Sequence, residues 1–422
     1  MSEPRFIEGE IRVIGDRWSP RVHTLKDFLA RSRVPFRWLD LETDEQARAV
    51  AQSAIKGIDK FPVVIFPDGS ALADPDVRTV AAKLGLGIAP DSRYWDLIVV
   101  GGGPAGITAA IYAAADGLRT VVVEQGVPGG QISYSGAVEN YPGFPEALSG
   151  SELTRRAVQQ AERFGAEIVV TRMATKLRSE GNCLYVALDD DTELAAYTVL
   201  LAVGVSFRWL DAPGCPALVG AGIYHGAATA EASACTKQDV FILGGGNSAA
   251  QAALLLAQYA RTVTILALED SLEATMSKYL VDRIRNTRNV IVKTGYTIVG
   301  AEGKDHLEQI TISNVKTGET TTVPAMGLFV FIGATPRTEW LNGVIRRDDK
   351  GFIFSGVDCT QGNRIPQGWP LERPPFDLET SEPGVFVAGD VRKGSVKRLT
   401  AAAGEGAQAV DYIFRHCAAV RR

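Results

Sequence analysis

Two glycine-rich turns in the sequence have the spacing of dinucleotide-binding sites. The first, Gly101-Gly102-Gly103-Pro104-Ala105-Gly106, follows an apolar strand at 96–100 and precedes an alanine-rich segment. Its glycines permit a tight turn, close approach to a pyrophosphate and close packing of helix on strand. Glu124 ends the next predicted strand, where a carboxylate binds ribose hydroxyls. We therefore predict one dinucleotide site formed by Gly101, Gly103, Pro104, Ala105, Gly106, Glu124 and Gln125.

The second turn, Gly244-Gly245-Gly246-Asn247-Ser248-Ala249, follows an apolar strand at 239–243. Its spacing, with alanine at the sixth position, predicts another nucleotide cradle at the start of a helix. Two such strand–helix–strand units in one chain are the organisation of flavoenzymes that bind two dinucleotides. The predicted residues of the second site are Gly244, Gly246, Asn247, Ser248, Ala249 and Glu269.

From Tyr94 onward, the chain resembles the low-molecular-weight thioredoxin reductases of the pyridine nucleotide-disulfide oxidoreductase family. The resemblance rests on the two turns and on four further segments: Gly129-Gly130-Gln131, residues 139–143, Ala202-Val203-Gly204 and residues 384–390. It implies FAD at the first site and a homodimer. The residues that it adds to the FAD site are Gly130, Gln131, Asn140, Ala202, Gly204, Gly389, Asp390, Lys397, Arg398 and Leu399.

The resemblance also shows which residues are missing. The family carries a Cys-Ala-Thr-Cys-Asp segment before the second turn, and its two cysteines fall here on Ala227 and Ala230, around Ala228-Thr229. Alanine forms neither a disulfide nor a thiolate. Glu231 stands in the place of the aspartate, and we predict it as a general acid or base, the alternative being a solvated glutamate at a helix start. His225 is a second catalytic candidate that could titrate near neutrality, with a packed or exposed ring as its alternative.

A second departure concerns the nicotinamide. The family binds NADPH through a His-Arg-Arg run and a further arginine, where this chain has Ala267, Leu268, Glu269 and Glu273. Arginine forks suit a 2′-phosphate, and a carboxylate repels it. We therefore expect NADH, with Glu269 on its 2′-hydroxyl, ahead of NADPH. The alternative is a cradle that no longer holds a nicotinamide.

Residues 1–88 are predicted to form a separate module, joined to the rest by a linker at 85–93. Their strand and helix order resembles a glutaredoxin or thioredoxin-like fold. The position of the C-x-x-C motif in such folds holds Ser19-Pro20-Arg21-Val22, and Phe61-Pro62 resembles the cis-proline segment, so this module also lacks redox thiols. The predicted elements are strands at 11–15, 36–40 and 63–66 and helices at 21–30 and from Asp44.

Composition excludes several classes of function. The 422 residues carry a net charge of −5 and no long basic run, which gives no support to nucleic-acid or anionic-membrane binding. No apolar run reaches about 18 residues, and the start lacks a signal-peptide profile, so we expect a cytoplasmic protein without a membrane span. The five cysteines have no C-x-x-C and no metal-type spacing, so no metal site is predicted.

The predicted fold class is α/β, with two Rossmann-like three-layer dinucleotide-binding domains and an N-terminal thioredoxin-like α/β domain. The predicted function is that of an FAD-dependent oxidoreductase whose flavin acts directly on a small molecule. The alternatives are a thioredoxin-disulfide or ferredoxin-type NAD(P)H reductase with a protein acceptor, and a non-catalytic FAD-binding protein. The predicted domains are 1–88 (thioredoxin-like), 94–208 (FAD-binding, first part), 209–330 (NAD(P)-type) and 331–422 (FAD-binding, second part).

Overall fold

The computed structural model describes residues 10–225, 231–232, 234–360 and 369–420. They form two compact units, each with its own buried apolar clusters. The first unit contains the described parts of Met1–Val80, Tyr134–Gly136 and Phe207–Gly333. The second contains those of Ala81–Ser133, Ala137–Ser206 and Ala334–Arg422.

The second unit is built on a seven-stranded sheet with the order β7-β6-β5-β10-β9-β8, in which β21 also pairs with β10. Strands β7, β6, β5, β10 and β21 are parallel, and β9 and β8 are antiparallel to their neighbours. The near-continuous apolar run of β5 is buried, as expected of a central parallel strand. The bounds are β5 Tyr94–Val100, β6 Thr120–Val123, β7 Glu167–Val169, β8 Ala174–Glu180, β9 Cys183–Leu188, β10 Glu193–Leu201 and β21 Val385–Val387.

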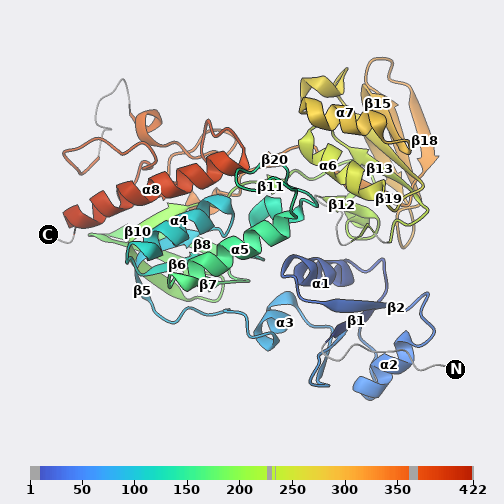
Figure 1. Cartoon of the computed structure of the whole chain (residues 1–422), viewed down its shortest axis with the longest axis horizontal. Helices are drawn as coiled ribbons and strands as arrows, with labels where there is room; N and C mark the ends of the chain where they lie inside the picture. Colours follow the sequence, from blue (N-terminus) through green and yellow to red (C-terminus); the bar gives the residue numbers. More distant parts are fainter. Residues whose placement is uncertain (1–9, 226–230, 233, 361–368, 421–422) are drawn as a thin grey trace. The chain divides into compact units, whose positions relative to one another are not determined.

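Helices α4 (Pro104–Ala115) and α8 (Leu399–Val420) lie side by side in this unit (Figure 1). Their backbones come close, because a Cβ atom on Gly406 of α8 would overlap the carbonyl oxygen of Ala105. Helix α4 begins at Pro104 after Gly103, an arrangement that favours helix initiation. The remaining elements are α5 Gly150–Arg163, η4 Glu339–Leu341, η5 Gly356–Cys359 and β20 Ala334–Thr335, whereas η1 Gly130–Tyr134 and β11 Ser206–Phe207 each have their last residue in the first unit.

The nucleotide-binding part of the first unit has a parallel five-stranded sheet with the order β12-β19-β13-β14-β15. A three-stranded antiparallel sheet, β16-β17-β18, accompanies it. This confirms the predicted α/β class with two parallel-sheet dinucleotide folds. The elements are η2 Pro216–Leu218, β12 Ile223–His225, β13 Asp239–Leu243, α6 Asn247–Leu256, β14 Thr262–Ala267, η3 Leu272–Ala274, α7 Lys278–Asn286, β15 Val290–Thr294, β16 Tyr296–Glu302, β17 Gln309–Asn314, β18 Thr320–Pro324 and β19 Gly327–Val330.

The N-terminal module, also in the first unit, has a four-stranded sheet with the order β2-β1-β3-β4. Strand β2 is parallel to β1, whereas β3 and β4 pair antiparallel. The Phe61–Pro62 peptide is cis. The predicted element order is present, and the assignment to a thioredoxin-like fold stays a prediction. The bounds are β1 Ile11–Gly15, α1 Pro20–Arg31, β2 Phe36–Asp40, α2 Ala47–Ala54, β3 Val63–Ile65, β4 Ala71–Ala73 and α3 Val77–Lys83.

The predicted linker at 85–93 contains no helix or strand, but its backbone is fastened to the second unit. The Val170 N–H donates to the Gly87 carbonyl at 2.8 Å, and the Arg172 guanidinium donates to the Ile88 carbonyl at 2.8 Å. The middle of the linker therefore does not run free.

We expect Gly406→Ala to destabilise the protein, because the added Cβ overlaps the Ala105 carbonyl oxygen. Overpacking of this kind costs about 1–3 kcal/mol. Gly404→Ala is the matched control on the same helix: a Cβ there meets nothing within 4 Å, and alanine favours a helix by about 0.5–1 kcal/mol. Urea unfolding midpoints measure both, and equal shifts would contradict the close approach of α4 and α8.

Candidate functional site

The first glycine turn meets two neighbouring loops backbone to backbone. Gly101 has φ +107°, and a Cβ on it would overlap the carbonyl oxygen of Ala202. A Cβ on Gly130 would lie 3.1 Å from the Cα atom of Gly103. The Gly129 N–H donates to the Gly102 carbonyl at 2.7 Å. The structure thus brings together three segments that are far apart in the sequence, around the start of α4.

Glu124 is held at the end of β6 by backbone donors. Its Oε2 accepts a hydrogen bond from the Gly102 N–H at 2.7 Å, and its Oε1 accepts one from the Gly126 N–H at 2.8 Å. These two hydrogen bonds fix the orientation of the carboxylate at the end of β6. The neighbouring Gln125 is exposed.

The segment after β21 is held by a residue that the sequence analysis missed. Glu405 of α8 accepts a hydrogen bond from the Gly389 N–H at 2.7 Å and pairs with Arg392 at 2.5 Å. Gly389 lies close to α4, since a Cβ on it would be 3.1 Å from that of Ala105. Burial raises the pKa of the adjacent Asp390, and the charge of Lys397 opposes this. In the sequence, Glu405 is recognisable only as a carboxylate on the helix that starts at Leu399.

The remaining predicted FAD-site residues differ in their contacts: some are held by neighbouring groups and others are exposed. Gln131 donates through Nε2 to the Val205 carbonyl at 2.6 Å, next to Gly204. Lys397 has φ +54°, and its ammonium lies 4.6 Å from the centre of the Phe352 ring. Arg398 and Asn140 are exposed.

These residues fit FAD. Gly103 caps α4 without a side-chain hydrogen bond, so the first amides of the helix are open to a pyrophosphate. Gly103 and Gly130 approach each other backbone to backbone, since a Cβ on Gly103 would lie 3.9 Å from the Cα atom of Gly130. Asp390 is half-buried, and its carboxylate oxygens can accept hydrogen bonds from a ligand that carries hydroxyl donors.

The second glycine turn also makes a close backbone contact that only glycine allows. Gly244 has φ +136°, and a Cβ on it would overlap the Phe331 carbonyl oxygen. Gly246 is the N-cap of α6, and a Cβ on it would meet nothing within 4 Å. Thr275 donates to the Gly245 carbonyl at 2.9 Å, and the Ser277 N–H donates to Asn247 at 2.7 Å. Segment 272–277 is therefore joined to the turn.

Glu269 points toward this turn. Its Oε2 lies 2.7 Å from the position that a Cβ on Gly245 would take. This oxygen is buried and has no hydrogen-bond partner among the described residues. A buried acceptor without a donor is costly, and a ribose hydroxyl would supply the donor. Glu273, in contrast, is paired with Arg285 at 2.5 Å on the surface.

Glu231 lies in the first unit and is only 2% exposed. This contradicts the alternative of a solvated glutamate. Its Oε1 is 2.7 Å from Nδ1 of His23 and 3.4 Å from Nζ of Lys26, both on α1. Burial works to raise the pKa of Glu231, but the hydrogen bond from His23 and the charge of Lys26 bring it below its usual value. A role as general acid or base stays a prediction, and Ala227–Ala230 lie outside the described residues.

His225, at the end of β12, is packed against the indole of Trp209, with 4.4 Å between ring centres. Its Nε2 accepts a hydrogen bond from the Leu210 N–H at 3.1 Å. Burial lowers the pKa of His225 to about 4. The expectation that it titrates near neutrality is therefore wrong, and the packed-ring alternative holds.

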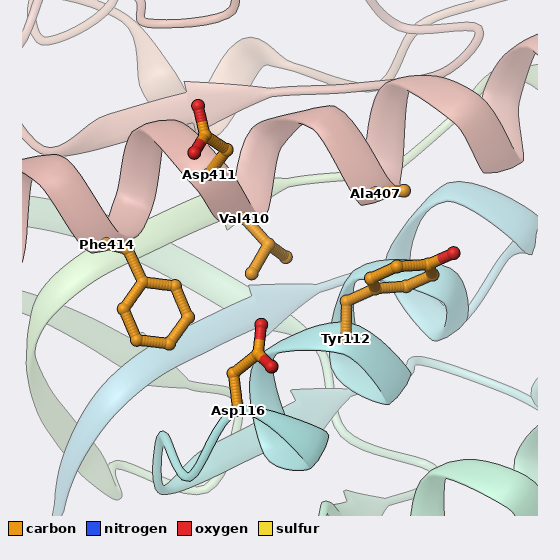
Figure 2. A pocket seen from close by; sticks show the side chains of 6 residues that line it. All are labelled: Tyr112, Asp116, Ala407, Val410, Asp411 and Phe414. Carbon is orange, nitrogen blue, oxygen red and sulfur yellow. The ribbon is translucent and has the colours of Figure 1, made fainter.

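A pocket of about 370 Å³ lies elsewhere, between the C-terminal part of α4 and the middle of α8 (Figure 2). Asp116 and Asp411 approach it from the two helices, together with the ring of Tyr112. It contains none of the predicted site residues, and most of the length of α4 separates it from Gly103.

Comparison with known proteins places both glycine turns in one family. The sequence model described as pyridine nucleotide-disulphide oxidoreductase matches residues 95–406. The chain belongs to this family. The match begins after the N-terminal module, which it leaves unassigned.

Three related proteins are similar to this chain over about three quarters of its length. A thioredoxin reductase of Mycolicibacterium smegmatis is 34% identical over 74% of this chain and 94% of its own length. A bifunctional thioredoxin reductase/thioredoxin of Mycobacterium leprae is 35% identical over 75% of this chain, which spans 64% of that protein. The crystal structure of Lactococcus lactis thioredoxin reductase has a TM-score of 0.68 at 28% identity, covering 77% of this chain and 99% of that one.

The protein is thus a thioredoxin reductase-like FAD-dependent oxidoreductase, whose family uses FAD and a nicotinamide nucleotide. In the described part of the chain, no helix is both long and apolar enough to span a membrane.

The lowered pKa of His225 predicts a pH dependence of stability. Because the folded-state value is about 4, against an ordinary 6.5, the unfolded state binds more protons between these values. The free energy of unfolding should therefore fall as pH decreases from about 6.5 toward 4. His225→Gln keeps an acceptor for the Leu210 N–H and should lose less stability between pH 7 and pH 5. Equal losses in urea titrations of the two proteins would contradict a buried neutral ring.

Proposed function

We propose that the protein passes electrons from NADH through FAD directly to a small-molecule acceptor, without a redox disulfide. The observation that carries this proposal is the state of its five cysteines, none of which forms a disulfide. Burial raises the pKa of Cys235 to about 12 and that of Cys359 to about 11. Both thiols are therefore protonated at neutral pH, and a protonated thiol is neither a nucleophile nor an electron relay.

The other three cysteines do not supply a pair either. Cys215 and Cys417 are buried, and burial also raises the pKa of Cys215. Cys183, on β9, has no second cysteine near it in the sequence. Together with alanine at 227 and 230, this leaves the flavin itself as the group that meets the substrate.

FAD, when bound, accepts a hydride from a nicotinamide and returns two electrons to an acceptor. In our proposal the turn at Gly101–Gly106 holds its pyrophosphate and Glu124 its adenosine ribose. Asp390, positioned through Gly389 and Glu405, accepts from hydroxyl groups of the ribityl chain. Lys397 and Arg398 supply positive charge next to this segment. The pyrophosphate would be bound by backbone amides and the ribose by a carboxylate held in place by two hydrogen bonds, which would keep the ligand oriented.

NADH is the proposed reductant because of Glu269. Its buried, unpartnered Oε2 suits the 2′-hydroxyl of an adenosine ribose. The same carboxylate would lie against a 2′-phosphate and repel it, and neither Ala267 nor Leu268 offers a compensating charge. A protein acceptor is the second candidate, because relatives of this chain are named as thioredoxin reductases. Homodimer formation and a cytoplasmic location stay predictions from the sequence.

We expect an anaerobic reductive titration to consume about two electron equivalents per bound flavin, since flavin is a two-electron carrier. An enzyme with a redox disulfide takes up about two more. Absorbance at the flavin maximum and a dithionite titration measure this directly. Consumption of about four equivalents would contradict the proposal, and a titration of the protein after thiol alkylation is the control.

The coenzyme assignment predicts that NADH reduces the flavin at least about tenfold faster than NADPH at equal subsaturating concentration, a difference of about 1.4 kcal/mol. Glu269→Gln removes the repulsion and should narrow this ratio. Glu273→Gln is the matched control, because that carboxylate is already paired with Arg285 and should leave the ratio unchanged. Stopped-flow flavin bleaching gives both rates, and a wild-type preference for NADPH would reject the role of Glu269.

A further inference from the structure

Helix α1 of the N-terminal module carries two different faces. Its apolar residues pack on the sheet of the module, with Val22, Leu25 and Leu29 almost fully buried. His23 and Lys26 lie one turn apart on another side, where residues three positions apart are neighbours. This second face contacts the nucleotide-binding part of the first unit.

The centre of the contact is a buried ion-pair cluster. Glu231 accepts from His23 at 2.7 Å, and both of its oxygens are 3.4 Å from Nζ of Lys26. The side chains of Lys26 and Glu231 are 4% and 3% exposed, and that of His23 is 26% exposed. The Lys26 ammonium also lies 4.2 Å from the centre of the Trp38 ring of the same module. Lysine and glutamate are rarely buried to this extent unless they are paired.

Two further contacts flank the cluster. Before α1, the indole of Trp18 stacks on His306, with ring centres 4.5 Å apart and planes 14° apart. At the first residue of α1, the Cα of Pro20 lies 2.9 Å from where a Cβ on Gly220 would be, so only glycine allows this approach. Gly220 also has φ +80°, which favours glycine independently.

The far end of α1 makes a fourth contact in the same unit. Arg31 donates to the hydroxyl of Tyr134 at 2.8 Å, and its guanidinium lies 4.3 Å from the centre of that ring. The Tyr134 hydroxyl is also 3.5 Å from Asp27. The contacts therefore run along the whole helix, from the residue before its N-cap to its last residue.

We propose that the N-terminal module is a built-in cover: α1 occupies the surface around Gly220, Glu231 and His306, and Glu231 anchors it there. In the predicted thioredoxin-like fold the start of α1 would be the position of the thiols, and here it contacts another part of the same chain. The module is then a fixed part of the nucleotide-binding unit and not a mobile electron carrier. A buried pair that needs both partners also fixes one docking register, because any shifted register leaves a charge unpaired.

This inference adds a role for residues 10–80 and rests on the proposed function only in excluding electron transfer through the module. A double-mutant cycle on the full chain tests the anchor. Lys26→Met and Glu231→Gln should each lower the urea unfolding midpoint, because each leaves a buried partner unpaired. The double variant should be less destabilised than the sum of the two shifts. Additive shifts would show that Lys26 and Glu231 do not meet in solution and would overturn the cover.

Arg21→Ala is the matched control in a second cycle with Glu231→Gln. Arg21 lies on the same helix, but it is 53% exposed and pairs with Asp74 of its own module at 2.8 Å. Its shift and that of Glu231→Gln should therefore add. Coupling equal to that of Lys26 would mean that the cycle reports the stability of α1 as a whole, which would reject Glu231 as a specific anchor.

Hydrogen exchange on the same variants separates undocking from unfolding. Lys26→Met should raise exchange in segment 218–225 by roughly tenfold while β1 and β3 keep their protection. If Lys26→Met also raises hydrogen exchange in β1 and β3, the milder variant His23→Asn distinguishes undocking from unfolding. It removes the hydrogen bond between His23 and Glu231 and keeps Lys26. Unchanged exchange at 218–225 in both variants would overturn the cover. These readouts need neither NADH nor an acceptor, so failure of flavin reduction with the docking intact would reject only the proposed function.

Discussion

The structure depends on backbone approaching backbone around the start of α4. Gly101 and Gly406 each lie where a side chain would collide with another main chain, and a Cβ on Gly130 would lie only 3.1 Å from the Cα atom of Gly103. Dense interiors do not yield by the width of a methyl group without cost. These contacts hold the glycine turn, the loop at 129–130 and α8 in one arrangement, and Glu405 then brings the segment of Gly389 to the same place. The residues that we propose to bind FAD are thus positioned largely by close main-chain contacts.

Much of this framework could be predicted from the sequence because its signals are local. A glycine turn between an apolar strand and a helix specifies its own geometry within a few residues. The strands at 11–15 and 36–40 were predicted at their observed bounds for the same reason. Glu405 could not be predicted in this way. It pairs with Gly389 across 16 positions, and its sequence context is that of any glutamate on a helix.

The environment of Glu231 shows more clearly what could not be predicted from the sequence. Its partners His23 and Lys26 are 208 and 205 positions away, and a lysine on a short helix reads as a surface residue. The sequence therefore left only a catalytic or a solvated glutamate to choose between. His225 was misjudged for a related reason: the pKa of a histidine is set by burial, which a sequence does not show. In both cases the feature that the sequence does not show is long-range packing, not local structure.

The residue that replaces the second family cysteine and the residue that contacts α1 are neighbours in the sequence. Alanine stands at 230, and the next residue is the one that binds the N-terminal module. The family resemblance implies a pair of cysteines next to a carboxylate at this position. In this chain the carboxylate of Glu231 instead forms a buried ion pair with α1. One short segment thus contains both a position where the family has a redox cysteine and the residue that holds α1.

The contact between α1 and Glu231 joins two parts of one chain, and this has a consequence for how strong the contact must be. Because both parts belong to the first unit, docking is an intramolecular event and does not depend on the concentration of the protein. The interface along α1 can therefore be small and partly polar and still persist.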